Sequence, residues 1–212
     1  MKQINQEETN FLFEWVRNWY PTQAKPKIAI LLLDRDEWKN LYLQTPKMTP
    51  EEAKKRLAEA EAKLSEEQQE LCKEVEKLSD KQKEQLVRML MPHTFVREAG
   101  EFDYWMNEVS GECFAMEETK QFAEIFKQDI PALFKPYVNH DFVIIISNFF
   151  NKKQVKILKT QKQRDMFIHM SIFHELIHVI EHCNGTQIFK SDNRHEVDKI
   201  VHPITRTYFE DS

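Results

Sequence analysis

The residues most able to do chemistry are two histidines and a glutamate in the segment His174-Glu175-Leu176-Ile177-His178. Residues four positions apart share one face of an α-helix, so the imidazoles of His174 and His178 can point toward one cation. Glu175 is rotated by about 100° from His174 around the helix, which places its carboxylate beside a metal-activated water. This pattern predicts two metal ligands and a general base for a hydrolytic reaction.

Zinc is the expected cofactor. Zinc accepts neutral imidazole nitrogen and carboxylate oxygen in a tetrahedral arrangement and keeps one position open for water. The apolar residues Phe173, Leu176, Ile177 and Ile180 surround the motif, as is typical of a buried active-site helix. The alternative interpretation is a structural pair of histidines that binds no metal.

The longer segment Phe173-His174-Glu175-Leu176-Ile177-His178-Val179-Ile180-Glu181-His182 resembles the zincin metallopeptidases. Its pattern is similar to that of the gluzincin branch, which includes ImmA/IrrE-type regulatory proteases and minigluzincins. The metzincin pattern does not fit, because Glu181 and Asn184 stand where that pattern has glycine and histidine. The resemblance covers about residues 141–204 and implies a mixed sheet that lines the cleft, an active-site helix, and a later helix that supplies a glutamate ligand.

This resemblance implies that the third zinc ligand comes from the last helix, where Glu196 is the best candidate. Asp198, His195, Asp192 and His202 are also able to bind zinc and stay open as alternatives. These families often have a small residue and then an acidic residue three and four positions after the ligand glutamate, whereas this chain has Lys199 and Ile200 there.

The elements that must position these residues are visible as local patterns. The apolar runs at 27–34 and 141–148 predict two buried strands of one sheet. A long helix is expected from Gln163 to His182, ending at Asn184-Gly185, and a last helix is expected after the capping residues 191–193. For the oxyanion of the reaction, Asn139, His140, Arg206 and Tyr208 are candidate stabilising groups. An extended substrate is expected to pair with the edge of the strand at 141–148.

The remaining segments predict mostly helices. Amphipathic or helical patterns cover 5–20, 36–43 and 117–134, the last interrupted near Pro131, while 93–115 suggests short strands and turns around Gly100 and Gly111. His182 and Cys183, next to the motif, are interpreted as a surface or helix-capping histidine and an incidental cysteine. Residues 49–91 are rich in Ala, Glu, Lys, Gln and Leu after a Thr49-Pro50 helix start, which predicts a solvated helical insertion.

We therefore expect an α+β fold, a zincin-like domain with a small mixed sheet and an active-site helix, plus the charged helical insertion. The expected organisation is 1–48 as the N-terminal helix and strand of the catalytic domain, 49–91 as a helical insertion or arm, and 92–212 as the zincin-like core.

Composition limits the partners. The formal net charge of −5 over 212 residues argues against a general nucleic-acid or anionic-membrane binder, and no apolar run is long enough to span a bilayer. The three cysteines, Cys72, Cys113 and Cys183, show no CxxC spacing, and the N-terminus lacks signal-peptide features, so we expect a cytoplasmic protein.

The sequence thus predicts a zinc metallopeptidase acting on a peptide or protein substrate, with Glu175 as base and His174, His178 and Glu196 as ligands. The alternative is a zinc-binding regulatory or interaction protein without general peptidase activity, with a protein partner bound through the arm at 49–91.

Overall fold

The computed structural model describes residues 1–44, 102–125, 129–189 and 194–211. The predicted arm at 49–91, together with Gly100, Cys72 and Asp192, lies outside the described residues. Within them, no helix is long and apolar enough to cross a membrane.

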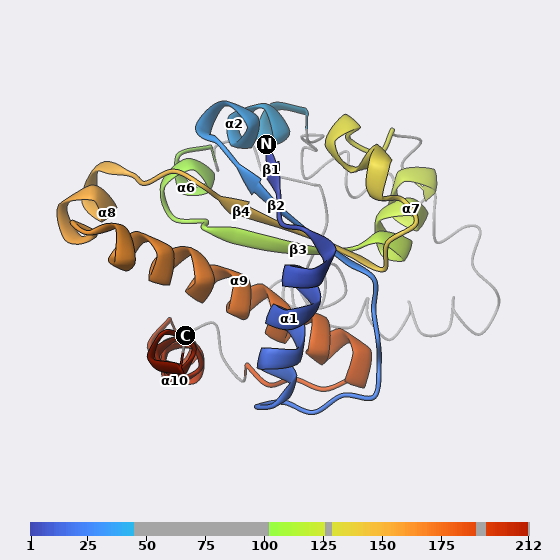
Figure 1. Cartoon of the computed structure of the whole chain (residues 1–212). Helices are drawn as coiled ribbons and strands as arrows, with labels where there is room; N and C mark the ends of the chain where they lie inside the picture. The colour runs from blue at the N-terminus through green and yellow to red at the C-terminus, as the bar shows by residue number, and fades with distance from the viewer. Residues whose placement is uncertain (45–101, 126–128, 190–193, 212) are drawn as a thin grey trace, which may run out of the picture.

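The described chain is an α+β fold around one small mixed sheet (Figure 1). Its strands, in spatial order, are β1 (Lys2–Gln3), β2 (Ile28–Leu33), β4 (Phe142–Ser147) and β3 (Gly111–Ala115). Strands β2 and β4 are parallel, and the outer strands β1 and β3 are antiparallel to their neighbours. The predicted pairing of the segments 27–34 and 141–148 in one sheet is confirmed by the register that joins Ile28 to Phe142 and Leu33 to Ser147.

The helices follow in chain order: α1 (Gln6–Arg17), α2 (Arg35–Gln44), α6 (Phe102–Asn107), α7 (Met116–Ile125), the 3-10 helix η1 (Ala132–Tyr137), α8 (Lys152–Ile157), α9 (Gln161–Asn184) and α10 (Arg194–Asp211). Helices α1 and α9 cover one face of the sheet, α10 packs on α9 away from the strands, and α2 and α6 cover the other face (Figure 1). Every residue of β2 and of β4 is buried, as expected for strands that are covered on both faces.

Alternate residues of each central strand face different cores. Ile28, Ile30 and Leu32 of β2 pack in the core with α9, whereas Ala29, Leu31 and Leu33 pack in the core with α2 and α6. One core therefore packs on each face of the sheet, and the core on the side of α9 places β3 and β4 against this helix.

The segment 93–115 differs in part from its prediction. A strand does form at β3, but residues 102–107 form the helix α6 instead of a turn or strand. Trp105 of α6 is buried and stacks on Trp38 of α2 with ring centroids 4.4 Å apart, and each indole N–H donates to the backbone carbonyl of the other tryptophan. This long-range pair, which satisfies both indole donors in the core, selects the helix.

The predicted place of a substrate strand at the edge of residues 141–148 is wrong. Strand β4 has neighbours on both sides, β2 and β3, and its backbone is paired along both edges. The outermost strand on the side of the sheet beyond β4 is β3, which packs against α9.

Candidate functional site

Helix α9 carries the whole HExxH motif and has a defined start and end. Thr160 and Gln163 form a capping box, in which the Thr160 hydroxyl accepts from the Gln163 backbone and the Gln163 side chain accepts from the Thr160 backbone. The helix ends at Gly185, whose φ of 60° is the left-handed conformation typical of a helix C-terminus. The predicted helix and its glycine stop are confirmed.

The two motif histidines converge as their spacing predicts. The Nε2 atom of His174 lies 3.2 Å from the Nε2 atom of His178. Two imidazole nitrogens bound to one tetrahedral zinc at 2.0–2.1 Å are separated by about 3.3 Å. The pair therefore fits two ligands of one zinc ion, and the same separation also allows one ring N–H to donate to the other nitrogen.

Glu181 binds His178 at Nδ1, the ring nitrogen that does not face His174. The sequence analysis assigned Glu181 no role. Its Oε2 atom lies 2.7 Å from Nδ1 of His178, and its Oε1 atom accepts from the backbone N–H groups of Ile188 at 2.5 Å and Phe189 at 2.7 Å. A carboxylate beside Nδ1 keeps the proton on that nitrogen and leaves the lone pair of Nε2 for a metal. The signal in the sequence was a carboxylate three residues after the second histidine, on the same helix face.

The charge of Glu181 is maintained by these contacts. Burial alone raises the pKa of a carboxyl group, but the hydrogen bonds from His178, Phe189 and Ile188 outweigh it and hold the pKa of Glu181 below its usual value. Glu181 is therefore an ionised acceptor at neutral pH.

The chain after α9 folds back over the imidazole pair. The ring of Phe189 is buried and stacks on His174 with centroids 4.8 Å apart, and it meets the edge of His178 at 5.1 Å. Because Glu181 binds the backbone of the same segment, one carboxylate fixes both a histidine and the residue that packs on the pair.

Glu175 is buried between α9 and the edge strand β3, with only 6% of its surface exposed. A Cβ atom at Gly111 of β3 would lie 3.0 Å from Oε1 of Glu175 and 2.8 Å from Cδ1 of Ile146, so a larger residue there would require the ends of these two side chains to shift. Burial raises the pKa of Glu175 to about 7, and the charge of Glu112 adds to this effect against the opposing influence of His178. A carboxyl group with a pKa near neutrality is suited to accept and return a proton.

His174 is less basic than an ordinary histidine. Burial and the neighbouring His178 lower its pKa to about 4, so its ring is neutral at neutral pH. A neutral ring with an available nitrogen is the form that binds a metal ion.

The candidate third ligands are not brought together with the pair in the part of the chain that the structure describes. Residues 1–44, 102–125, 129–189 and 194–211 contain no group of three His, Cys, Asp or Glu side chains that could hold a metal ion. Glu196 is exposed on the first turns of α10, and Asp198 lies 4.0 Å from His202 on the same helix. Asp192 and the side chain of His195 lie outside what is described.

The other predicted residues lie around this site in different roles. His182 is exposed, as expected, and its Nε2 lies 2.9 Å from a carboxylate oxygen of Glu118 on α7. Cys183 is a half-buried free thiol. Of the oxyanion candidates, Arg206 donates from Nε to Glu210, and Tyr208 packs on His169 with ring centroids 5.1 Å apart.

His140, on the loop before β4, donates its backbone N–H to Tyr137, and Asn139 beside it is exposed.

Comparison with known proteins gives no match: no family model, curated protein or solved structure matches this chain.

Proposed function

We propose that the protein is a zinc-dependent peptide hydrolase of the gluzincin type, to which its motif is similar. The observation that carries the proposal is that the Nε2 atoms of His174 and His178 lie 3.2 Å apart on one helix. The residue after His174 is Glu175, whose carboxyl group is buried. Glu181 supports it, because a carboxylate behind a histidine is the usual partner of a metal-binding imidazole.

Zinc would be held by His174 and His178, with Glu196 proposed as the third ligand. When bound there, the ion acts as a Lewis acid that polarises a substrate carbonyl and lowers the pKa of a water molecule. Glu181 keeps the ring of His178 oriented, and Phe189 limits the access of solvent to the pair.

Glu175 would act as the general base. Its carboxylate takes a proton from the attacking water and returns it to the nitrogen that leaves when the peptide bond breaks. Its burial under β3 favours this exchange, since the raised pKa lets the group hold the proton between the two steps.

The substrate would lie beside β3, in place of the edge of β4 that the sequence analysis proposed. Strand β3 is the outermost strand next to α9, and Gly111 brings its backbone against Glu175. A peptide that extends along β3 therefore reaches the general base.

Metal content tests the ligands. Purified wild type should contain one zinc per chain, and His178→Ala should lose it, because that substitution removes one of the two converging nitrogens. His182→Ala, one turn further along α9 and bound to Glu118, is the matched control and should retain zinc. Retention of stoichiometric zinc by His174→Ala/His178→Ala would disprove the site.

The third ligand has its own test. Glu196→Ala should weaken zinc binding by at least about 10-fold, by comparison with the effect of disturbing metal-site partners. If Asp198→Ala or His202→Ala has this effect and Glu196→Ala does not, the ligand assignment on α10 is wrong.

Catalysis is tested with Glu175→Gln, which keeps size and removes the base. Hydrolysis should fall by about 10²- to 10⁴-fold while the zinc content stays at the wild-type level. Glu117→Gln, an exposed residue at the start of α7, is the control for the loss of one carboxylate. Equal turnover by Glu175→Gln and wild type would exclude the mechanism.

A further inference from the structure

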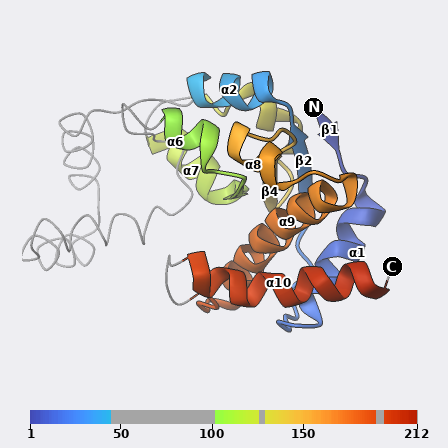
Figure 2. The ribbon, with the colours of Figure 1, turned by 90° about the vertical axis from the view of Figure 1, so that its left-hand side faces the viewer.

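A cavity of about 590 Å³ lies between α9 and α10, and none of His174, Glu175, His178 and Glu196 lines it. Its walls are mostly apolar, and they include Leu158, Met166, Phe167, Met170, Pro203 and Arg206. Helix α10 runs across α9 (Figure 2), and residues of both helices line the cavity together with Leu158. Its volume is in the range of sites that bind small molecules or peptide side chains.

The cavity lies against the face of α9 that carries His174. Gln163, Phe167, Met170 and His174 follow one another at spacings of four, three and four residues, so they form one stripe along the helix. At 1.5 Å per residue, Phe167 lies about 10 Å along the axis from His174. An extended peptide covers that distance with about three residues.

A basic segment borders the cavity on the side of Leu158. Residues 152–164 contain six basic residues and no acidic residue, in a chain whose net charge is −5. These are Lys152, Lys153, Lys156, Lys159, Lys162 and Arg164. The five lysines are exposed, and Val155 and Ile157 among them are 49% and 70% exposed. The segment therefore presents positive charge and apolar surface together.

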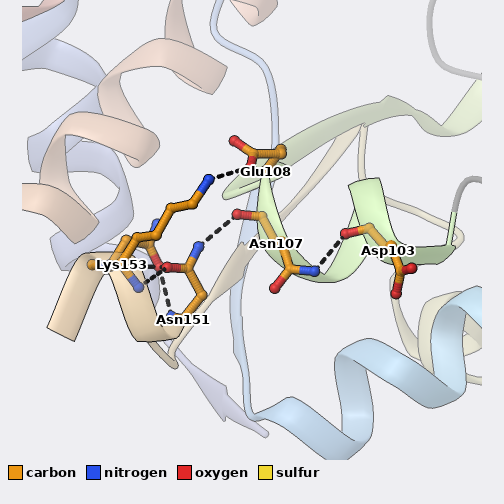
Figure 3. Close-up of polar contacts among 6 residues, drawn as sticks. Asp103, Asn107, Glu108, Asn151 and Lys153 are labelled. Atoms are coloured by element: carbon orange, nitrogen blue, oxygen red, sulfur yellow. Dashed lines mark hydrogen bonds and ion pairs between the residues drawn. The ribbon is translucent and has the colours of Figure 1, made fainter. Parts of the chain in front are cut away.

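The basic segment is held firmly against the body of the fold (Figure 3). Asn151 caps α8, and its Nδ2 donates to the backbone carbonyl of Asn107 at 2.6 Å, while Nδ2 of Asn107 donates to the carbonyl of Asp103 at 2.8 Å. Lys153 lies 4.0 Å from Glu108 at the end of the same chain of contacts. These bonds tie the start of α8 to α6 and to the residue that follows it.

We propose that the cavity between α9 and α10 and the basic segment 152–164 form a docking site for an extended acidic peptide with an apolar anchor. The apolar side chain fills the cavity two to four residues from the bond to be cleaved, and acidic side chains face Lys156 and Lys159. This inference rests on the proposed hydrolase and names its substrate class.

The positive charge of the basic segment indicates a negatively charged ligand. The stripe on α9 that leads to His174 indicates a peptide instead of a membrane. Positively charged segments with exposed apolar residues also bind anionic membranes. Helix α8 has only six residues, however, and the cavity beside it is concave and aligned with His174, so it fits a chain that reaches the imidazole pair better than a flat lipid surface.

The test uses synthetic fluorescent peptides and the full-length chain. One peptide carries phenylalanine followed by glutamates, a second has lysine in place of glutamate, and a third has serine in place of phenylalanine. The wild type should bind the first peptide at least about 10-fold more tightly than the other two, and added salt should weaken that binding.

The variant Lys156→Glu/Lys159→Glu changes only exposed side chains, so its fold should be unaffected. Its affinity for the first peptide should fall about 10-fold, while the control Lys25→Glu/Lys39→Glu, with the same charge change on exposed residues elsewhere, should bind as wild type does. Equal affinity of the two variants for this peptide would overturn the docking site. So would binding to vesicles of phosphatidylcholine and phosphatidylserine that is lost in Lys156→Glu/Lys159→Glu, without binding of any peptide.

Hydrolysis of the same peptides separates this inference from the function on which it rests. Turnover of all three peptides at the same rate would overturn the docking site and leave the hydrolase in place. Selective binding of the acidic peptide without turnover of any peptide would support the docking site and overturn the hydrolase.

Discussion

Glu181→Gln is the change that tests most directly how the imidazole pair is positioned. The wild-type carboxylate accepts on both sides, from Nδ1 of His178 and from the N–H groups of Ile188 and Phe189. An amide has one accepting oxygen and one donating nitrogen, so it cannot accept on both sides. Its nitrogen then faces either the N–H groups of Ile188 and Phe189, which leaves donors opposed, or Nδ1 of His178, which must give up its proton in order to accept.

The size of the effect follows from this conflict. In the first arrangement, an opposed donor at this half-buried site costs about 1–3 kcal/mol. For a chain of this size, that corresponds to a melting temperature about 2–12 °C lower. If the amide nitrogen faces His178, the proton moves to Nε2, the atom that would bind zinc, and the affinity for zinc should fall about 10- to 100-fold.

The assay is a competition between the metal-free protein and a coloured zinc chelator, together with thermal unfolding followed by circular dichroism. Glu118→Gln is the matched control, because it changes the carboxylate that binds the exposed His182 on the same helix. That exposed pair should contribute less than about 1 kcal/mol and should not affect zinc. A Glu181→Gln protein that is folded and binds zinc as tightly as wild type would refute the proposed role of Glu181.

Three further substitutions test the surroundings of the site. Gly111→Ala places a methyl group against Ile146 and Glu175, so peptide hydrolysis should fall while zinc content stays unchanged, and a fully active variant would show that β3 does not position the base. Gly185→Ala meets no atom within 4 Å but must keep φ near 60°, so it should lower the free energy of unfolding by about 1 kcal/mol in urea titrations, and an unchanged midpoint would contradict this. Phe189→Ala should lower it by about 3–5 kcal/mol, since a buried ring on the imidazole pair is lost, and a loss below 1 kcal/mol would mean that the ring contributes little.

Much of the central fold could be predicted from local patterns. Strand β2 is an uninterrupted apolar run and β4 is apolar up to its last residue, Ser147, and their burial on both faces follows from that composition. Helix α9 is delimited by Thr160 and Gly185, two residues whose capping roles depend only on their near neighbours. Such features need no knowledge of distant parts of the chain.

The errors concern features that depend on distant contacts. The helix around Trp105 is selected by its stack on Trp38, 67 residues away, and the position of β4 inside the sheet depends on β3. Glu181 is recognisable as a partner of His178 by spacing, but its second role depends on the path of the chain at Phe189, beyond the end of the helix. The third zinc ligand also depends on such a path, and spacing alone does not choose it.

The parallel pairing of β2 with β4 has a consequence for biosynthesis. Asp141, the residue before β4, donates its backbone N–H to the carbonyl of Lys27 and accepts from the Lys27 N–H through its carboxylate, although Lys27 is 114 residues earlier. At about 5–20 residues per second, a ribosome delivers β4 roughly 6–23 s after β2. During that interval the uncharged strand Ile-Ala-Ile-Leu-Leu-Leu has left the tunnel without its main partner. The nascent chain therefore passes through a period in which chaperone binding or self-association at residues 28–33 competes with folding.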